Sequence, residues 1–242
     1  MIKAIFFDLD GTLLPIDEND FVKLYFKLLT ERVKDYGYDS EELIKNVWAG
    51  TKAMYANDGS TTNERVFWDV FKACYGEERM KDKPLFDDFY LNGFKGLIDI
   101  CKPNPLARDI VDFCKRTVQY TVLTTNPIFP LNGQLTRMGF LGLKAEDFDY
   151  VTAYENSSFT KPNPGYFIEV MEKFGLKPEE VVLFGNNEKE DGDCAVGAEI
   201  KCYMVGDYVI KNSASPNKFK HIDVDEIIIT IQREIEMNKN IA

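Results

Sequence analysis

Residues 2–14 read IKAIFFDLDGTLL, and this stretch decides the fold. Its short apolar run, residues 4–7, ends at Asp8, which is typical of a strand buried on both faces of a sheet. Side chains two apart on a strand point to the same side, so Asp8 and Asp10 present two carboxylates together, and Gly11 lets the chain turn away. In open α/β sheets, ligands bind at the carboxyl ends of the strands. The stretch therefore predicts a buried strand that carries two acidic side chains into a ligand crevice.

Three further runs of apolar and β-branched residues predict strands of the same kind. Each is short and lies between turn residues, as buried strands of parallel sheets usually do. They are residues 118–124, 181–184 and 202–205.

Helical patterns alternate with these strands. One opens at Asn104 and Pro105, and another opens at Pro164 and ends before Gly175. Proline in the first turn and glycine past the last turn are the usual signals of helix ends. Alternating strands and helices indicate an α/β fold with a doubly wound, parallel, Rossmann-like sheet. The final stretch, residues 223–235, is expected to be a helix, although its β-branched centre also fits a strand.

Residues 15–100 break this alternation because their apolar residues recur only at helical spacing. Both tryptophans, Trp48 and Trp68, lie in this segment, where aromatic side chains are expected to form the core of a helical bundle. We therefore predict two domains. Residues 1–14 and 101–242 form the Rossmann-like core, and residues 15–100 form a helical domain inserted after the first strand.

The formal net charge of the 242-residue chain is −11. An acidic surface repels nucleic-acid phosphates and anionic lipid headgroups, so neither nucleic acid nor a membrane is an expected partner. The chain also has no apolar run long enough to cross a bilayer. A small anionic substrate remains compatible with this charge where a local cation or a metal overrides it.

Cysteine and histidine usage narrows the chemistry. The five cysteines are scattered, odd in number and without a CxxC pair, which is typical of reduced thiols in a cytoplasmic protein. The single histidine, His221, argues against a serine–histidine triad and against a multi-histidine metal site. His221 itself is expected to be exposed. Catalysis must therefore use carboxylates, lysine, hydroxyls or cysteine.

Polar residues follow the predicted strands near the same edge of the sheet. Thr125 and Asn126 come after residues 118–124, where a hydroxyl and an amide can bind phosphate oxygens. The same pair before Pro127 also fits an ordinary turn. Lys161 lies in a Lys-Pro-Asn-Pro sequence, where it either offsets the charge of clustered carboxylates or is a solvated loop lysine.

The segment after the third predicted strand, residues 185–195, reads GNNEKEDGDCA. Its acidic residues offer oxygen ligands for a hard cation, although an acidic surface loop gives the same pattern. Those residues are Glu188, Glu190, Asp191 and Asp193. Two adjacent carboxylates such as Asp8 and Asp10 are costly unless a cation lies between them or one is protonated. Ligation by oxygen alone favours magnesium.

Together these motifs resemble the haloacid dehalogenase superfamily. IFFDLDGTL is similar to the family's first motif, VLTTN to the second, KPNP to the third and the glycine–acidic loop to the fourth, all in the family's order. The helical insert after the first motif matches the placement of the family's type 1 cap. The resemblance implies a Rossmann-like core, a helical cap and a hydrolase of the phosphatase branch.

Carried over to this sequence, the resemblance implies a role for each motif residue. Asp8 attacks phosphorus and becomes an aspartyl-phosphate. Asp10 protonates the leaving oxygen and then activates water. Thr125 and Asn126 bind the phosphate, and Lys161 steadies both the phosphate and Asp8.

The fourth motif departs from the family pattern. The family carries two aspartates there, four or five positions apart; Asp191 matches the second, but Asn187 or Asn186 stands at the first. An amide oxygen can ligate a hard cation but adds no charge, so weaker metal binding is expected unless Glu190 compensates. The implied ligands of Mg²⁺ are Asp8, the backbone carbonyl of Asp10, Asn187 and Asp191.

The expected function is a magnesium-dependent phosphomonoester hydrolase that acts on a small phosphorylated metabolite. A phosphomutase of the same fold shares the catalytic residues and is the first alternative. A binding or regulatory protein that lost turnover through Asn186 and Asn187 is the second. The sequence specifies neither the substrate nor the oligomeric state.

Overall fold

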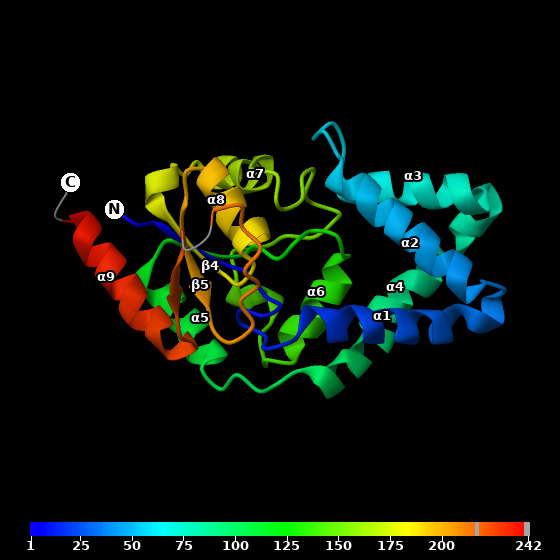
Figure 1. The fold of residues 1–242 in the computed structure, drawn as a ribbon, viewed down its shortest axis with the longest axis horizontal. Coiled ribbons are helices and arrows are strands. Elements are labelled where there is room, and N and C mark those ends of the chain that lie inside the picture. Colours follow the sequence, from blue (N-terminus) through cyan, green and yellow to red (C-terminus); the bar gives the residue numbers. More distant parts are fainter. Residues whose placement is uncertain (216–217, 240–242) are drawn as a thin grey trace.

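A six-stranded parallel sheet forms the centre of the molecule, with helices on both faces (Figure 1). The computed structural model describes residues 1–215 and 218–239. The strand order is β3–β2–β1–β4–β5–β6, so the first strand lies in the middle of the sheet. The strands are β1 (Ala4–Phe7), β2 (Tyr120–Leu123), β3 (Tyr150–Val151), β4 (Val181–Gly185), β5 (Lys201–Val205) and β6 (Lys220–Ile222). The predicted doubly wound α/β fold is confirmed.

The side chains of β1 point alternately to the two faces of the sheet, and helices pack against both faces. Ala4 and Phe6 enter the apolar cluster that contains α7 and α8, whereas Ile5 and Phe7 enter the cluster that contains α5 and α9. All four side chains are fully buried, which stabilises the fold by roughly 1.5–3 kcal/mol for each large one. The helices of the core domain, α6 included, have the following bounds: α5 (Ala107–Thr117), α6 (Leu131–Gly139), α7 (Gly165–Phe174), α8 (Cys194–Gly197) and α9 (Ile227–Lys239).

Three details differ from the expectations or resolve them. Strands β3 and β6 were not predicted, because they are too short to show a hydrophobic period. Helix α5 begins later than expected, because the side chain of Asn104 accepts from the N–H of Leu106 at 3.1 Å and forms a turn of its own. The final stretch is a helix, and its β-branched residues Ile227 and Ile231 lie on one buried face.

The insert contains helices and no strand over residues 15–100, all of which the structure describes. Its helices lie together at one end of the molecule (Figure 1). They are α1 (Glu18–Val33), η1 (Lys34–Tyr36), α2 (Ser40–Tyr55), α3 (Asn63–Tyr75), η2 (Glu77–Asp82), α4 (Lys83–Leu91) and η3 (Gly93–Ile100). Helix α2 packs against α3, and α1 packs against η3.

Only one of the two tryptophans belongs to the core of the insert. Trp68 is 7% exposed and packs among Phe71 and Phe86, as expected for a bundle core. Trp48 is 48% exposed and contacts Phe26, so the expectation that it is buried was wrong.

The insert and the sheet share one continuous apolar cluster. Helix α6, which follows β2, packs against α4 and η3 of the insert. In the described part of the chain, no helix has both the length and the apolar character needed to cross a bilayer.

Candidate active site

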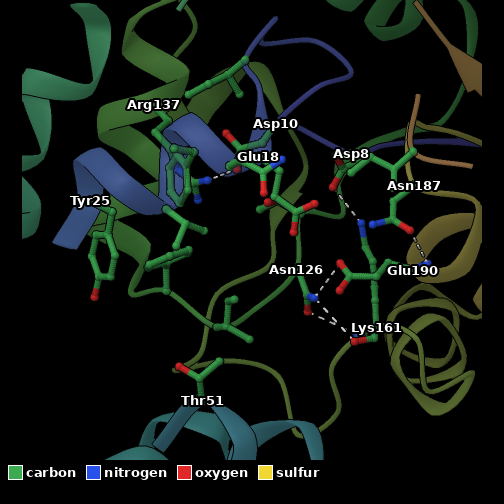
Figure 2. Close-up of a pocket in the computed structure, with 18 of the residues that line it drawn as sticks. Asp8, Asp10, Glu18, Tyr25, Thr51, Asn126, Arg137, Lys161, Asn187 and Glu190 are labelled. Carbon is green, nitrogen blue, oxygen red and sulfur yellow. Dashed lines mark hydrogen bonds and ion pairs between the residues drawn. The ribbon is translucent and has the colours of Figure 1, made fainter. Parts of the chain in front are cut away.

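A cavity of about 720 Å³ lies between the carboxyl ends of the strands and the helical insert. All the site residues predicted from the sequence line it, namely Asp8, Asp10, Thr125, Asn126, Lys161, Asn187 and Asp191. Figure 2 shows Asp8, Lys161, Asn187 and Glu190 on one side, Asp10 and Arg137 next to them, and Tyr25 and Thr51 farther away. The topology thus brings four separate motifs to one crevice.

Lys161 connects the first and fourth motifs. Its Nζ donates to Asp8 Oδ1 at 2.7 Å and to Asp191 Oδ1 at 2.5 Å, and the side chain is only 1% exposed. Burial acts to lower the pKa of Lys161, but the Asp191 and Asp8 carboxylates raise it well above its usual value. Burial raises the pKa of Asp8 to about 6, against the opposing charge of Lys161. Lys161 is therefore a buried counter-charge, and the alternative of a solvated loop lysine was wrong.

The turn after β1 brings Asp8 next to Asn186. Gly11 adopts a φ of +79°, and a Cβ added to it would lie 2.1 Å from Nδ2 of Asn186, so only glycine fits. The hydroxyl of Thr12 lies 3.3 Å from Asp8 Oδ2 and 3.3 Å from Asn186 Oδ1. Both oxygens therefore lie within reach of one hydroxyl.

The fourth-motif loop directs its two asparagines differently. Asp191 Oδ2 accepts from the backbone N–H groups of Asn186 and Asn187, each at 3.0 Å. Asn187 Oδ1 accepts from the N–H groups of Lys189 and Glu190, each at 3.1 Å, so it caps its own loop. The geometry therefore does not favour the predicted ligand role of Asn187. The side-chain oxygen of Asn186, the other position considered, faces the hydroxyl of Thr12, which also contacts Asp8.

The other acidic residues of this loop do not all face the cavity. Glu188 pairs with the exposed His221 at 3.2 Å, and Asp193 accepts from the hydroxyl of Ser213 at 2.8 Å. The expected exposure of His221 is confirmed. Of the four acidic residues in the loop, Glu190 and Asp191 line the cavity.

The oxygens that meet near Asp8 suit a magnesium ion held by few protein ligands. Among the described residues, no group of three or more His, Cys, Asp or Glu side chains is placed to hold a metal. Mg²⁺ needs no such group, because it keeps several waters and is often bound by one or two carboxylates together with substrate phosphate. The single Thr12 hydroxyl can donate to only one of its two neighbouring oxygens, which leaves the other available. Asp8, Asn186 and Asp191 thus form a donor set that fits Mg²⁺.

Asn126 connects the second, third and fourth motifs. Its Oδ1 accepts from the N–H of Lys161 at 3.2 Å, and its Nδ2 donates to Glu190 Oε2 at 3.0 Å. The hydroxyl of Tyr55, at the end of α2, donates to Glu190 Oε1 at 3.1 Å, so this network also joins the insert to the core. Burial raises the pKa of Glu190 to about 7, against the opposing charge of Lys161. Thr125, the residue before Asn126, also lines the cavity and is 3% exposed.

Arg137 on α6 is a site residue that the sequence analysis missed. It is 1% exposed, and its guanidinium pairs with Asp10 Oδ2 and donates to Gln134 Oε1. Its guanidinium carbon lies 5.1 Å from the ring centre of Phe129 and 5.5 Å from that of Phe21. Burial lowers the pKa of Arg137 to about 9. The other carboxylate oxygen of Asp10 is buried without a partner among the described residues.

The sequence gives only a weak signal that Arg137 and its partner Gln134 belong to the site. Gln134 and Arg137 are three residues apart, so they lie on one face of α6. Polar residues at that spacing are usually on the solvent side of a helix, and nothing in the sequence marks this face as buried.

Comparison with known proteins agrees with the family resemblance of the four sequence motifs. A family model described as haloacid dehalogenase-like hydrolase matches residues 2–198. A glyceraldehyde 3-phosphate phosphatase of Methanothermobacter thermautotrophicus is 26% identical over 245 aligned residues, which cover 100% of both chains.

Solved structures resemble the whole chain. A protein described as a β-phosphoglucomutase from Thermotoga maritima has a TM-score of 0.55 at 21% identity, covering 96% of this chain and 99% of its own. The HAD-hydrolase YfnB from Bacillus subtilis, solved bound to magnesium, has a TM-score of 0.58 at 17% identity, covering 95% and 98%. At such identities the likeness shows the fold alone.

Proposed function

The chain belongs to the haloacid dehalogenase-like hydrolases, and we propose that it is a magnesium-dependent phosphomonoester hydrolase acting on a small phosphorylated substrate. The observation that carries the proposal is the buried cluster in which Lys161 contacts both Asp8 and Asp191 at the end of β1. A carboxylate held beside a fixed cation is arranged for nucleophilic attack on a phosphate whose charge that cation also offsets.

In the proposed mechanism, Asp8 acts first. Its carboxylate oxygen attacks phosphorus, the bond from phosphorus to the ester oxygen breaks, and Asp10 gives a proton to the departing oxygen. Lys161 holds Asp8 in place, and the hydroxyl of Thr125 is positioned to contact the phosphate oxygens. Bound Mg²⁺, held by Asp8, Asn186, Asp191 and the carbonyl of Asp10, would offset the charge of the phosphate.

In the second half of the mechanism, Asp10 acts as a base. It takes a proton from a water molecule, whose oxygen attacks phosphorus and releases Asp8 together with inorganic phosphate. Proton transfer of this kind typically contributes about 10²–10⁴-fold to the rate. The pairing with Arg137 suits this step, because Arg137 holds one carboxylate oxygen of Asp10 while the other has no partner among the described residues and can take the proton.

We also propose that residues 15–100 form the cap and that residues 1–14 and 101–242 form the core. The helices of the insert provide one wall of the cavity, so they are placed to exclude bulk water and to select the substrate. The B. subtilis neighbour, whose structure is reported to reveal interdomain movement, supports such a division.

Hydrolysis is preferred over a phosphomutase reaction. The curated relative that matches both chains over their full lengths is named a phosphatase. Retention of Asp8, Asp10 and Lys161 in one cavity argues against a protein that has lost turnover. The five cysteines are all unpaired, which fits a reducing compartment such as the cytoplasm.

The test is release of inorganic phosphate from a panel of phosphorylated metabolites, with and without Mg²⁺. We expect release that requires Mg²⁺, is lost when the metal is chelated and is absent from Asp8→Asn. No Mg²⁺-dependent release from any member of the panel, or full activity of Asp8→Asn, would contradict the proposal.

A further inference from the structure

Beyond the catalytic residues, the cavity continues between the helices of the insert. Side chains from four different helices line this part, and most of them are aromatic or aliphatic. The aromatic ones include Phe21 and Tyr25 of α1, Trp48 of α2, Trp68 of α3 and Phe86 of α4. Bundle interiors are normally close-packed. An open space with this lining is therefore a candidate for the place that receives the non-phosphate part of the substrate.

Several polar groups in this part of the cavity already have hydrogen-bond partners within the protein. The hydroxyl of Thr51 donates to the carbonyl of Val47 at 2.9 Å, and the hydroxyls of Tyr25 and Tyr90 lie 2.9 Å apart. Tyr25 and Thr51 lie away from Asp8 and Lys161 (Figure 2). These bonds leave few groups to pair with the hydroxyls of a sugar or polyol, and a hydroxyl without a partner is costly in a buried site.

The charges of the lining argue against a second anionic group on the substrate. Among the described residues that line the cavity, the cations are Lys161 and Arg137, and each is already paired with a carboxylate. Asp17, Glu18 and Asp207 also line it and add negative charge. A bisphosphate or a phosphorylated acid would therefore meet repulsion and no free cation.

We propose that the physiological substrate is a phosphate monoester of a bulky apolar alcohol or phenol with no second anionic group. The proposal rests on the phosphatase function proposed above and specifies its substrate class. Its phosphate would lie against Asp8 and Lys161, and its apolar body would lie among Phe21, Trp68 and Phe86. The cavity of about 720 Å³ has the size of an ordinary small-molecule site.

The test compares phosphates that differ in the leaving group but hardly in intrinsic reactivity. The series is n-propyl, n-pentyl and n-hexyl phosphate with the intact protein and Mg²⁺. Glycerol 3-phosphate is the polar control, because it is propyl phosphate with two added hydroxyls. We expect kcat/KM to rise about fourfold for each methylene and so about 60-fold over the three methylenes from propyl to hexyl. Glycerol 3-phosphate should be a poorer substrate than propyl phosphate.

Two variants that add the same side chain test the location. Val22 lines the cavity, whereas its neighbour Lys23 is exposed on α1. Val22→Trp should remove most of the preference for hexyl over propyl phosphate, and Lys23→Trp should leave that ratio unchanged. Thr51→Phe fills the cavity from α2 and serves as a second filling variant, with folding of each checked by circular dichroism.

Acetyl phosphate separates the two possible failures. If wild type hydrolyses acetyl phosphate through Asp8 but shows no gain with chain length, or prefers glycerol 3-phosphate, the apolar substrate class is overturned and the phosphatase function stands. A chain-length preference that survives folded Val22→Trp and Thr51→Phe would also overturn it. If no phosphate compound, acetyl phosphate included, is hydrolysed, the proposed function itself fails.

Discussion

The ion pair between the buried Arg137 and the half-buried Asp10 is the contact between single residues that most affects the proposed chemistry. Arg137 holds one oxygen of Asp10, while the other oxygen has no partner among the described residues. Gln134 and a wall of aromatic rings fix the guanidinium in turn. We infer that Arg137 positions Asp10 for the step in which it activates water.

Arg137→Met should therefore slow hydrolysis of the aspartyl-phosphate more than its formation. We expect kcat to fall by about 10- to 100-fold, because a hydrogen bond to a charged group contributes roughly 1.5–3 kcal/mol. Phosphoenzyme formed from acetyl phosphate should accumulate, as measured by rapid acid quench. Arg108→Met, at a half-buried arginine that does not line the cavity, is the control. An unchanged kcat, or a loss without accumulation, would show that Arg137 has no such role.

We expect Mg²⁺ affinity to respond differently when one negative charge is added at each of the two asparagines of the fourth motif. Asn186→Asp places a carboxylate beside Asp8 and Thr12, so Mg²⁺ should bind on the order of tenfold more tightly, since ligand charge tunes the affinity for hard cations. Asn187→Asp should bind Mg²⁺ no more tightly than wild type, because that side chain caps its loop. Calorimetric titration distinguishes them. Tighter binding of Mg²⁺ by Asn187→Asp alone would support Asn187 as the Mg²⁺ ligand, as the sequence analysis assigned it.

At this scale the sequence predicts residues whose motifs lie directly after strands. Asp8, just after β1, and Thr125, just after β2, reach the cavity because parallel strands end at one edge of the sheet, whereas Lys161 was identified through its Lys-Pro-Asn-Pro sequence. The sequence does not predict the orientation of side chains in this loop: whether Asn186 or Asn187 would face the proposed metal depends on hydrogen bonds within the loop. Arg137 was missed because its role depends on the burial of one face of α6, which only the packing against the insert creates.

At the scale of elements, the start of α3 fastens the insert to the core. The side chain of Asn63 is fully buried and donates to the carbonyls of Pro127 at 3.2 Å and Phe159 at 3.0 Å. It also accepts from Asn57 at 2.8 Å. The insert is thus connected to the core by the chain itself near residues 15 and 101 and, in addition, by the hydrogen bonds of Asn63.

Asn63→Ala should destabilise the protein by about 2–4 kcal/mol, because it leaves several buried polar groups without partners. The measurement is the free energy of unfolding from urea titration. Asn92→Ala, at an exposed asparagine whose side chain bonds to the surface residues Asp88 and Lys95, should change stability by less than about 0.5 kcal/mol. Equal effects of the two substitutions would mean that α3 is not fastened in this way.

The predictability of elements follows their length and burial. The four long strands were identified because a buried strand is a continuous apolar run. β3 and β6, with two and three residues, form only because longer strands beside them offer free N–H and C=O groups. The ambiguity of residues 227–231 arose because β-branched residues favour strands, and packing against the core decided for a helix.

At the scale of the whole molecule, the insert contacts the core across the site. Tyr55 of α2 bonds to Glu190, so the proposed cap touches the fourth-motif loop directly. We expect this contact to open during substrate entry and product release, as in enzymes whose lids close over the reaction. The sequence predicted an inserted helical segment, but the cavity within it could not be foreseen, because it depends on how the helices are spaced.

We expect the molecule to become more compact when the site is filled. Small-angle scattering should show a smaller radius of gyration after addition of Mg²⁺ and beryllium fluoride, a mimic of the phosphoryl group. Tyr55→Phe removes the hydroxyl that contacts Glu190 and should reduce this change. An unchanged radius in wild type, despite binding demonstrated by calorimetry, would mean that the cap is fixed on the core.

The central claim is that Asp8 carries the phosphoryl group, and trapping of that intermediate tests it most directly. Asp10→Asn is incubated with acetyl phosphate and Mg²⁺, quenched in acid and digested, and its peptides are examined by mass spectrometry. The account predicts one phosphoryl group on Asp8, which accumulates because Asp10 no longer activates water, and none in the variant that also carries Asp8→Asn. A phosphoryl group on another residue, or its persistence after Asp8 is replaced, would contradict the account.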